Sequence, residues 1–229
     1  MEIFRNIPPK NNFLKKVRNL ATKKNIILIF DECSSGFRES FGGLHLKYKV
    51  YPDMCILGKA LGNGFPITAV LGKRNIMENA QSSFISSTFW TERSGYVAGL
   101  KTLEVMENIN SWKIITNQGK KIKRMVNRIA KNNNISINTS GLDACPSYSI
   151  NSNKWQEYKT FITQELLKKN ILGANTTYVS ICHNDRVIKK YEIELNKIFE
   201  IIRKIETSGE NMDNYLKGPV SHSGFKRLN

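Results

Sequence analysis

Residues 25–31 read Asn-Ile-Ile-Leu-Ile-Phe-Asp, and this stretch decides the fold class. A continuous β-branched and aromatic run that ends in an acid is typical of a strand buried in a parallel sheet. The preceding residues, 11–24, carry apolar side chains at helical spacing, at Phe13, Val17, Leu20 and Ala21. A helix followed by a buried strand predicts an α/β sheet. Chemistry in such sheets gathers at the carboxyl ends of the strands, which is where Asp31 lies.

The rest of the sequence divides at about residue 110, where the pattern of apolar and basic residues changes. Before that point we expect strands over residues 54–57, 68–72 and 84–90 and a helix over residues 94–108. Beyond it, a very basic amphipathic pattern predicts a helix over residues 112–131, and apolar residues at i, i+3 and i+4 spacing predict a long helix over residues 185–207. A further helix is expected over residues 155–169. Short strands are expected over residues 135–138 and 178–182. The tail, residues 208–229, is polar and is predicted to be irregular.

The chain is strongly basic, because 35 Lys and Arg residues against 19 Asp and Glu residues give a net charge of +16. Such a charge can mark a nucleic-acid-binding surface. Lysine outnumbers arginine here, however, whereas bidentate contacts to nucleic acids favour arginine. We therefore interpret most of the charge as compositional drift and solvated helix faces, and keep a basic nucleic-acid-binding protein as an alternative.

Composition also limits the compartment and the kind of site. A hydrophobic fraction of 40% can fill a core, so the chain as a whole is not disordered. No apolar run is long enough to cross a bilayer, and the first residues lack the apolar segment of a signal peptide. The four cysteines form no CxxC pair, which argues against a zinc site or a disulfide framework. We expect a cytoplasmic protein without a metal site.

Three side chains in the first region have complementary chemistry. Asp31 ends one strand, Lys59 follows the next strand beside Gly58, and Thr88 lies in a Ser/Thr-rich segment. A glycine leaves room for a ligand to approach the backbone, and a desolvated lysine is a nucleophilic amine that forms Schiff bases. A carboxylate beside a pyridine nitrogen keeps that nitrogen protonated, and a threonine hydroxyl can donate to a phosphate.

Each of these residues also has an ordinary structural explanation. An acid after a strand is more often a turn or cap residue, and a lysine in a loop is usually exposed to solvent. The glycines that surround Lys59 form neither a Walker loop nor a GxGxxG motif. The three residues therefore point to a site through their spacing and context, and none of them does so alone.

That context resembles a known family. Residues 30–38 (Phe-Asp-Glu-Cys-Ser-Ser-Gly-Phe-Arg) and 52–67 (Pro-Asp-Met-Cys-Ile-Leu-Gly-Lys-Ala-Leu-Gly-Asn-Gly-Phe-Pro-Ile) are similar to the paired motifs of class III aminotransferases. The branch they resemble is that of glutamate-1-semialdehyde 2,1-aminomutase and its aminotransferase relatives. The likeness runs to about residue 207 and is weaker in the second region, where residues 181–185 resemble the segment before the family's last helix.

The resemblance implies a fold and a domain organisation. The fold is the α/β, C-terminal part of a pyridoxal-phosphate-dependent transferase of fold type I. Residues 1–110 would be a partial cofactor-binding large domain built on a parallel sheet, residues 111–207 an α+β small domain, and residues 208–229 a tail.

The resemblance also implies roles for single residues. Lys59 would form the internal aldimine with pyridoxal 5′-phosphate and later act as general base, and Asp31 would pair with the pyridinium nitrogen. Cys33 would pack on the ring, where the family usually has Val. Thr88 would reach the cofactor phosphate, typically that of the partner subunit in a homodimer. Candidates near the substrate are Arg38, Trp90 and Glu92. Residues 87–93 depart from the family's usual Gly-Thr followed by Asn-Pro, which leaves the substrate open.

The largest departure from the family is an absence. The family's phosphate-binding cup and ring-stacking aromatic lie upstream of the strand that ends in Asp31, so about half of a full-length enzyme is expected to be missing here. For the full-length parent we expect amino-group transfer between a small-molecule amino donor and a carbonyl acceptor. We do not expect the 229 residues to do this alone. The alternatives are a 2,1-aminomutase (an isomerase), and an inactive remnant or one subunit of a split enzyme.

Overall fold

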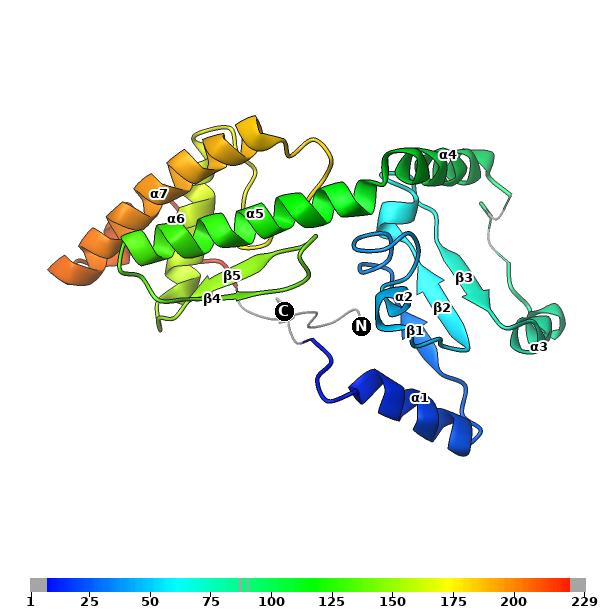
Figure 1. Ribbon diagram of the computed structural model, residues 1–229. Coiled ribbons are helices and arrows are strands. Elements are labelled where there is room, and N and C mark those ends of the chain that lie inside the picture. Colours follow the sequence, from blue (N-terminus) through cyan, green and yellow to red (C-terminus); the bar gives the residue numbers. More distant parts are fainter. Residues whose placement is uncertain (1–7, 87, 90, 223–229) are drawn as a thin grey trace. The chain divides into compact units, whose positions relative to one another are not determined.

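The computed structural model describes residues 8–86, 88–89 and 91–222. The chain divides into two compact units, Met1–Thr116 and Asn117–Asn229 (Figure 1). None of the helices in the described ranges combines the length and the apolar character that crossing a membrane requires.

A three-stranded sheet forms the centre of the first unit (Figure 1). Its strands are β1 (Ile29–Asp31), β2 (Met54–Leu57) and β3 (Ala69–Gly72), in the order β1-β2-β3. β1 and β2 run parallel, with Asp31 opposite Ile56, and β3 runs antiparallel to β2. The prediction of an α/β sheet is confirmed, and the carboxyl ends of β1 and β2 lie at the same edge.

Helices and short turns connect these strands. The α-helices are α1 (Phe13–Lys23), α2 (His45–Tyr48), α3 (Arg74–Met77) and α4 (Arg93–Ile109), and the 3₁₀ turns are η1 (Lys59–Leu61) and η2 (Glu78–Ser82). Leu14 of α1 packs with Phe30 of β1 and with Val50. A second buried cluster holds Phe37, Cys55, Leu57 and Leu61. Phe37 and Leu61 belong to the segments that follow β1 and β2, so their burial in this cluster helps to hold those segments.

Three expectations for the first unit need correction. The strand predicted over residues 84–90 is wrong for its described residues, which form turns and irregular structure. The strand predicted over residues 25–31 shortens to β1, because Ile26 and Ile27 have no neighbouring strand in the described part and are exposed. The predicted apolar side of the first helix is also wrong in part, since Leu14 and Ala21 are buried while Phe13 and Leu20 are exposed.

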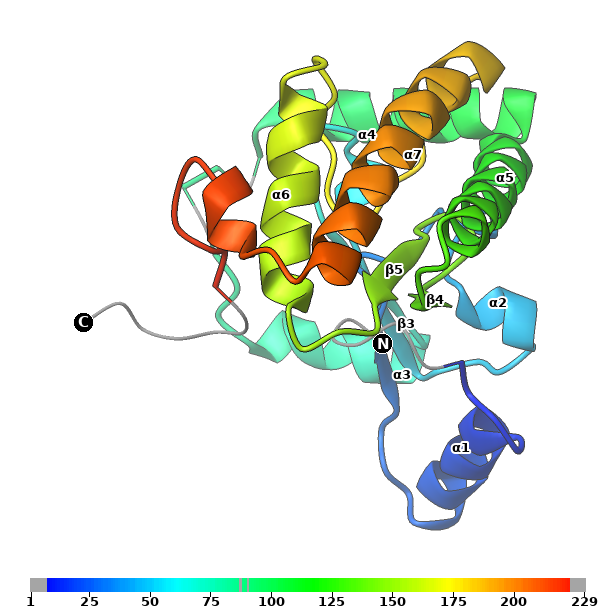
Figure 2. The same cartoon turned by 90° about the vertical axis from the view of Figure 1, so that its left-hand side faces the viewer.

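The second unit packs helices on one side of a β-hairpin. Its elements are most of α5 (Ser111–Asn132), then β4 (Ile137–Ser140), β5 (Ser147–Ile150), α6 (Trp155–Leu167), α7 (Asp185–Ser208) and η3 (Met212–Tyr215). β4 and β5 pair antiparallel, and Figure 2 shows α6 and α7 side by side above them. The core is apolar and almost fully buried, with Phe161, Leu166, Leu195, Phe199 and Ile202 at its centre.

The helices of this unit match the predictions closely, whereas the strands do not. The predicted strand at 178–182 is wrong, because the bridge to β5 forms at Thr176 and the residues beyond are irregular. β5 was not predicted. η3 lies in the tail, which was predicted to be irregular, and Met212 of η3 is fully buried.

α5 approaches the loop after β4 so closely that a Cβ at Gly119 would lie 1.6 Å from the Asp143 carbonyl oxygen.

Candidate active site

Lys59 lies just beyond the carboxyl end of β2 and begins η1. Its φ of 42° is in the left-handed region, which costs energy for a residue other than glycine. The side chain is exposed, and Nζ hydrogen-bonds to Oγ of Ser34, which is buried in the loop after β1. A strained backbone and a side chain held by a buried hydroxyl are features of a lysine that is positioned for a task.

Asp31 is the last residue of β1 and Cys33 lies in the loop that follows, at the same edge of the sheet as Lys59. The Asp31 carboxylate is half-buried, and its Oδ1 accepts a hydrogen bond from the Cys33 amide at 3.1 Å. A Cβ at Gly58 would lie 3.4 Å from the Cys33 sulfur, so the sulfur lies against this glycine, just before Lys59. The structure therefore brings together three of the residues singled out from the sequence.

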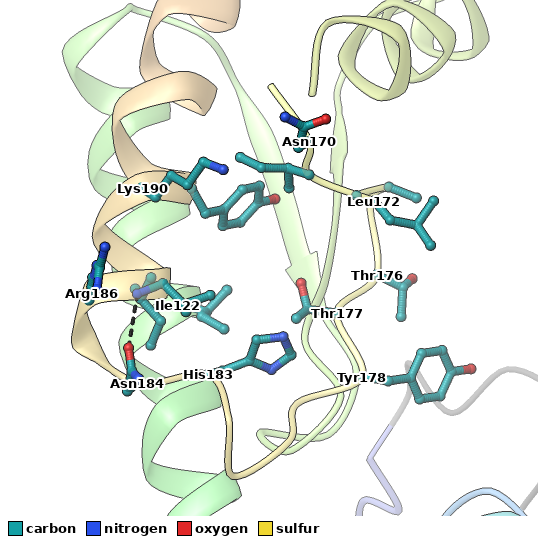
Figure 3. A pocket seen from close by; sticks show the side chains of 16 residues that line it. Ile122, Asn170, Leu172, Thr176, Thr177, Tyr178, His183, Asn184, Arg186 and Lys190 are labelled. Carbon is teal, nitrogen blue, oxygen red and sulfur yellow. Dashed lines mark hydrogen bonds between the residues drawn. The ribbon is translucent and has the colours of Figure 1, made fainter. Parts of the chain in front are cut away.

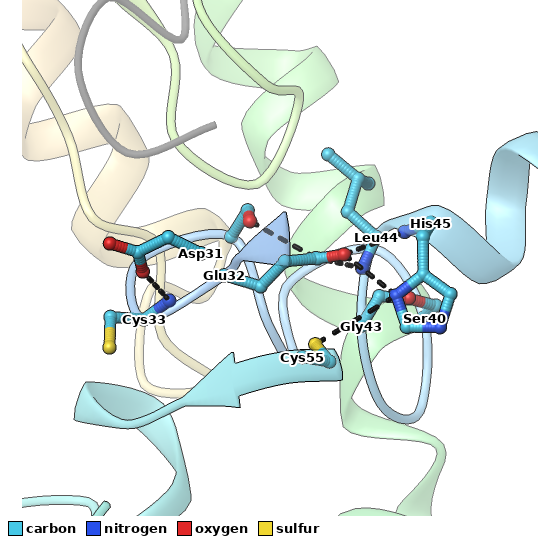
Figure 4. Close-up of polar contacts among 9 residues, drawn as sticks. Asp31, Glu32, Cys33, Ser40, Gly43, Leu44, His45 and Cys55 are labelled. Carbon is cyan, nitrogen blue, oxygen red and sulfur yellow. Dashed lines mark hydrogen bonds and ion pairs between the residues drawn. The ribbon is translucent and has the colours of Figure 1, made fainter. Parts of the chain in front are cut away.

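Glu32 points away from Asp31 and into the protein (Figure 4). Its side chain is fully buried and accepts hydrogen bonds from the Leu44 amide, the His45 amide at 3.0 Å and the Ser35 hydroxyl at 3.1 Å. His45 Nδ1 also lies 2.7 Å from Oε1 of Glu32. Consecutive residues at a strand end face opposite sides, so Glu32 anchors the loop from inside while Asp31 faces the candidate site.

Glu32, His45 and Cys55 place three possible metal-ligating atoms within 4.8 Å of one another. The carboxylate is already occupied by the hydrogen bonds of the loop. Burial, followed by the nearby Glu32 carboxylate, raises the pKa of the Cys55 thiol to about 12, so the thiol stays protonated at neutral pH. We interpret this group as a hydrogen-bonded core cluster that holds the loop after β1.

The remaining candidates from the sequence lie in different settings. Arg38 is half-buried, and its Nε lies 3.4 Å from the Ser34 carbonyl oxygen that accepts from it. Glu92 caps α4 by accepting from the Ser94 and Gly95 amides, and its hydrogen bonds to Ser94 lower its pKa. Thr88 lies in an exposed turn, and Trp90 lies outside the described residues. The site roles of all of these residues stay predictions.

The residues at this edge fit the ring of a pyridoxal-type cofactor. They offer a primary amine at Lys59, a half-buried carboxylate at Asp31, and a backbone without Cβ atoms at Gly58 and Gly62. At Gly62 a Cβ would meet the Phe65 carbonyl oxygen at 2.1 Å, so only glycine permits this turn.

Sequence reasoning missed two contributors to this edge, the Ser34 contact to Lys59 and the Glu32 network. Both residues stand in the motif that follows β1, but their contacts depend on how the loops pack.

Comparison with known proteins relates this chain to aminotransferases and an aminomutase. A sequence model described as aminotransferase class-III matches residues 6–202. The 3-aminobutyryl-CoA aminotransferase of Cloacimonas acidaminovorans is 32% identical over 179 residues, which cover 76% of this chain and 43% of that protein. The glutamate-1-semialdehyde 2,1-aminomutase of Saccharolobus islandicus is 32% identical over 209 residues, which cover 84% of this chain and 48% of that protein.

Solved structures agree with this chain in fold. The Sphingopyxis FumI protein in its PLP internal aldimine form superposes with a TM-score of 0.80 at 16% identity, over 89% of this chain and 50% of that one. A transaminase with PLP bound gives a TM-score of 0.79 at 18% identity, over 86% of this chain and 49% of that one. The fold is therefore that of these transaminases, and the chain spans about half the length of the relatives it matches.

Proposed function

Because this chain belongs to the class-III aminotransferase family, we propose that it carries the lysine and carboxylate part of a pyridoxal-phosphate-dependent amino-transfer site. The observation that carries the proposal is the meeting of Asp31, Cys33 and Lys59 at the carboxyl ends of two parallel strands. The family match gives these residues their chemistry, and the contacts at this edge are compatible with it.

The residues have distinct tasks in this proposal. The bound cofactor supplies an electron-withdrawing protonated pyridine ring, which makes a proton on the carbon next to the substrate amine acidic. Asp31 holds the proton on the ring nitrogen through its carboxylate, and Cys33 packs on the ring. Lys59 accepts the substrate proton at Nζ and returns it at a different carbon. The Ser34 hydroxyl orients Nζ for this proton transfer.

The unpaired edge of β1 supports the view that the activity needs more of the fold. The Leu28 carbonyl oxygen and the Glu32 amide bond toward β2, at Met54 and Ile56. Since bonding directions alternate along a strand, the amide and carbonyl of Ile29 point to the opposite edge. In the described part of the chain no strand pairs with that edge, and Ile29 is 49% exposed. We propose that the other half of the fold, in the same or a separate chain, covers it.

The substrates in this proposal are a small-molecule amino donor and a carbonyl acceptor. The complete enzyme is a homodimer in which Thr88, in its exposed turn, serves the cofactor phosphate of the partner subunit's site. A 2,1-aminomutase uses the same residues to move an amino group within one molecule, and the aminomutase among the similar proteins supports this variant.

The basic charge does not favour a nucleic-acid-binding function. Three cations of α5 are paired with acids of the second unit: Lys121 with Asp185 at 2.6 Å, Lys123 with Asp143 at 3.0 Å, and Arg128 with Glu192. An ion-paired cation is less available to a phosphate backbone, because binding would first have to break the pair.

Reductive labelling tests the proposal directly. The purified chain is mixed with pyridoxal phosphate, treated with borohydride and digested, and the labelled lysines are located by mass spectrometry. We expect the label to concentrate on Lys59, and Asp31→Asn to reduce its share. Lys73→Ala is the matched control, because Lys73 is an exposed lysine of the same unit that pairs with Asp53. This variant should leave the share of the label on Lys59 unchanged.

The labelling pattern and the absorption spectrum together test whether Lys59 is the cofactor lysine and whether this chain binds the cofactor alone. Label spread evenly over the lysines, with no preference for Lys59, would contradict the proposed site. A visible absorption band that disappears in Lys59→Ala would show that this chain binds the cofactor without the rest of the fold. Selective labelling without a stable band would support the site and assign tight binding to the other half of the fold.

A further inference from the structure

A cavity of about 770 Å³ lies entirely within the second unit. Its walls are residues 170–174 and 176–178, the first turns of α7, and Ile122 of α5 (Figure 3). Pockets for small molecules usually measure about 300–1,000 Å³, so this one is large enough for an organic ligand. It contains none of the residues assigned to amino transfer.

The charged residues that line the cavity are all basic. Arg186 and Lys190 line it, and none of its lining residues is Asp or Glu. Within the described ranges neither cation forms a direct ion pair, although Lys190 lies close enough to Glu194 to help lower the pKa of that carboxyl. Figure 3 shows Lys190 reaching across from α7 toward Asn170. A cation beside a cavity whose lining has no acid favours an anionic ligand.

His183 adds a neutral donor to the same cavity. Its Nδ1 accepts a hydrogen bond from the Ser180 amide at 2.9 Å, and burial lowers the pKa of the ring. A neutral histidine whose Nδ1 accepts must carry its hydrogen on Nε2, which is then a donor. Figure 3 shows the ring turned into the cavity toward Thr177, whose hydroxyl has no hydrogen-bond partner among the described residues.

The other walls are largely apolar, formed by Ile122, Ile171, Leu172, Val187 and Ile188. A ligand that fits places its negative charge beside Lys190 and an apolar body against these side chains, while His183 and Thr177 offer donors in another part of the cavity. A phosphate would pair with the cation but leave the apolar wall unfilled. We infer that the cavity binds a small carboxylate with a short apolar chain.

Ligand titration by NMR of the full chain tests this inference. Butanoate is the probe, and butylammonium, butan-1-ol and inorganic phosphate are the comparisons, each followed by amide shifts of residues 170–178 and 183–190. We expect butanoate to shift these amides with saturation. Lys190→Gln should weaken its binding about fivefold, because one charge is lost near the carboxylate. Lys204→Gln removes an equal charge from α7 outside the cavity and should leave the affinity unchanged.

Several results would overturn the inference. Equal binding of butan-1-ol or butylammonium would show an apolar cavity that does not select an anion. Tighter binding of phosphate than of butanoate would show an anion site of another class. No shift of these amides with about 50 mM butanoate would mean that the cavity takes no such ligand. Because both variants lie outside the Lys59 edge, these results are independent of the proposed amino transfer.

Discussion

Replacing Glu32 with alanine removes the acceptor on which the loop after β1 depends. The buried carboxylate accepts from the Leu44 and His45 amides, the Ser35 hydroxyl and the His45 ring. Each buried donor left without an acceptor costs about 1–3 kcal/mol. Since the loop can relax and admit water, we expect Glu32→Ala to lower the free energy of unfolding by about 3–5 kcal/mol.

Native-state hydrogen exchange at increasing urea concentrations measures this loss in the first unit alone, at the strand amides of β1 and β2. Glu32→Gln keeps one acceptor oxygen and should cost about 2 kcal/mol. Glu78→Ala is the surface control, since this exposed glutamate pairs with the exposed Arg74, and its effect should stay within about 0.5 kcal/mol. Equal stability of Glu32→Ala and Glu78→Ala would refute the role given to the buried carboxylate.

Other consequences can be measured on the same chain. The Leu28 amide, Lys73 and Arg18 hold the pKa of Asp53 well below its usual value, so Asp53 stabilises the fold above about pH 4 and this contribution fades as the pH falls further. Asp53→Asn should lower the unfolding free energy by about 1–2 kcal/mol at neutral pH and flatten its decline toward pH 2 in urea titrations. Gly119→Ala should destabilise the second unit by more than about 3 kcal/mol because its Cβ meets a carbonyl, whereas Gly218→Ala, in open space, should leave the melting temperature unchanged. Burial keeps the Cys55 thiol protonated, so mass spectrometry should show iodoacetamide modifying it at least about tenfold more slowly than the exposed Cys182; similar rates would contradict the burial of Cys55.

Much of the candidate site was predictable because its residues follow strands. Asp31 and Lys59 come directly after two apolar runs, and parallel pairing places both runs' ends at one edge. The contact of Ser34 with Lys59 was not predictable, because it depends on the curvature of two loops. The strand at β5 was missed since Ser-Tyr-Ser-Ile buries only every second side chain and lacks a long apolar run.

The family, the α/β class and the order of the main helices follow from the sequence alone, because these depend on local periodicity and on motifs within short stretches of chain. Which polar groups meet depends on tertiary packing. Glu32 finds its partners 12 and 13 residues away, and the cavity in the second unit joins Ile122 to residues 170–191. Such contacts arise only when helices and loops pack, since burial and hydrogen-bond geometry are properties of the folded chain that no local pattern encodes.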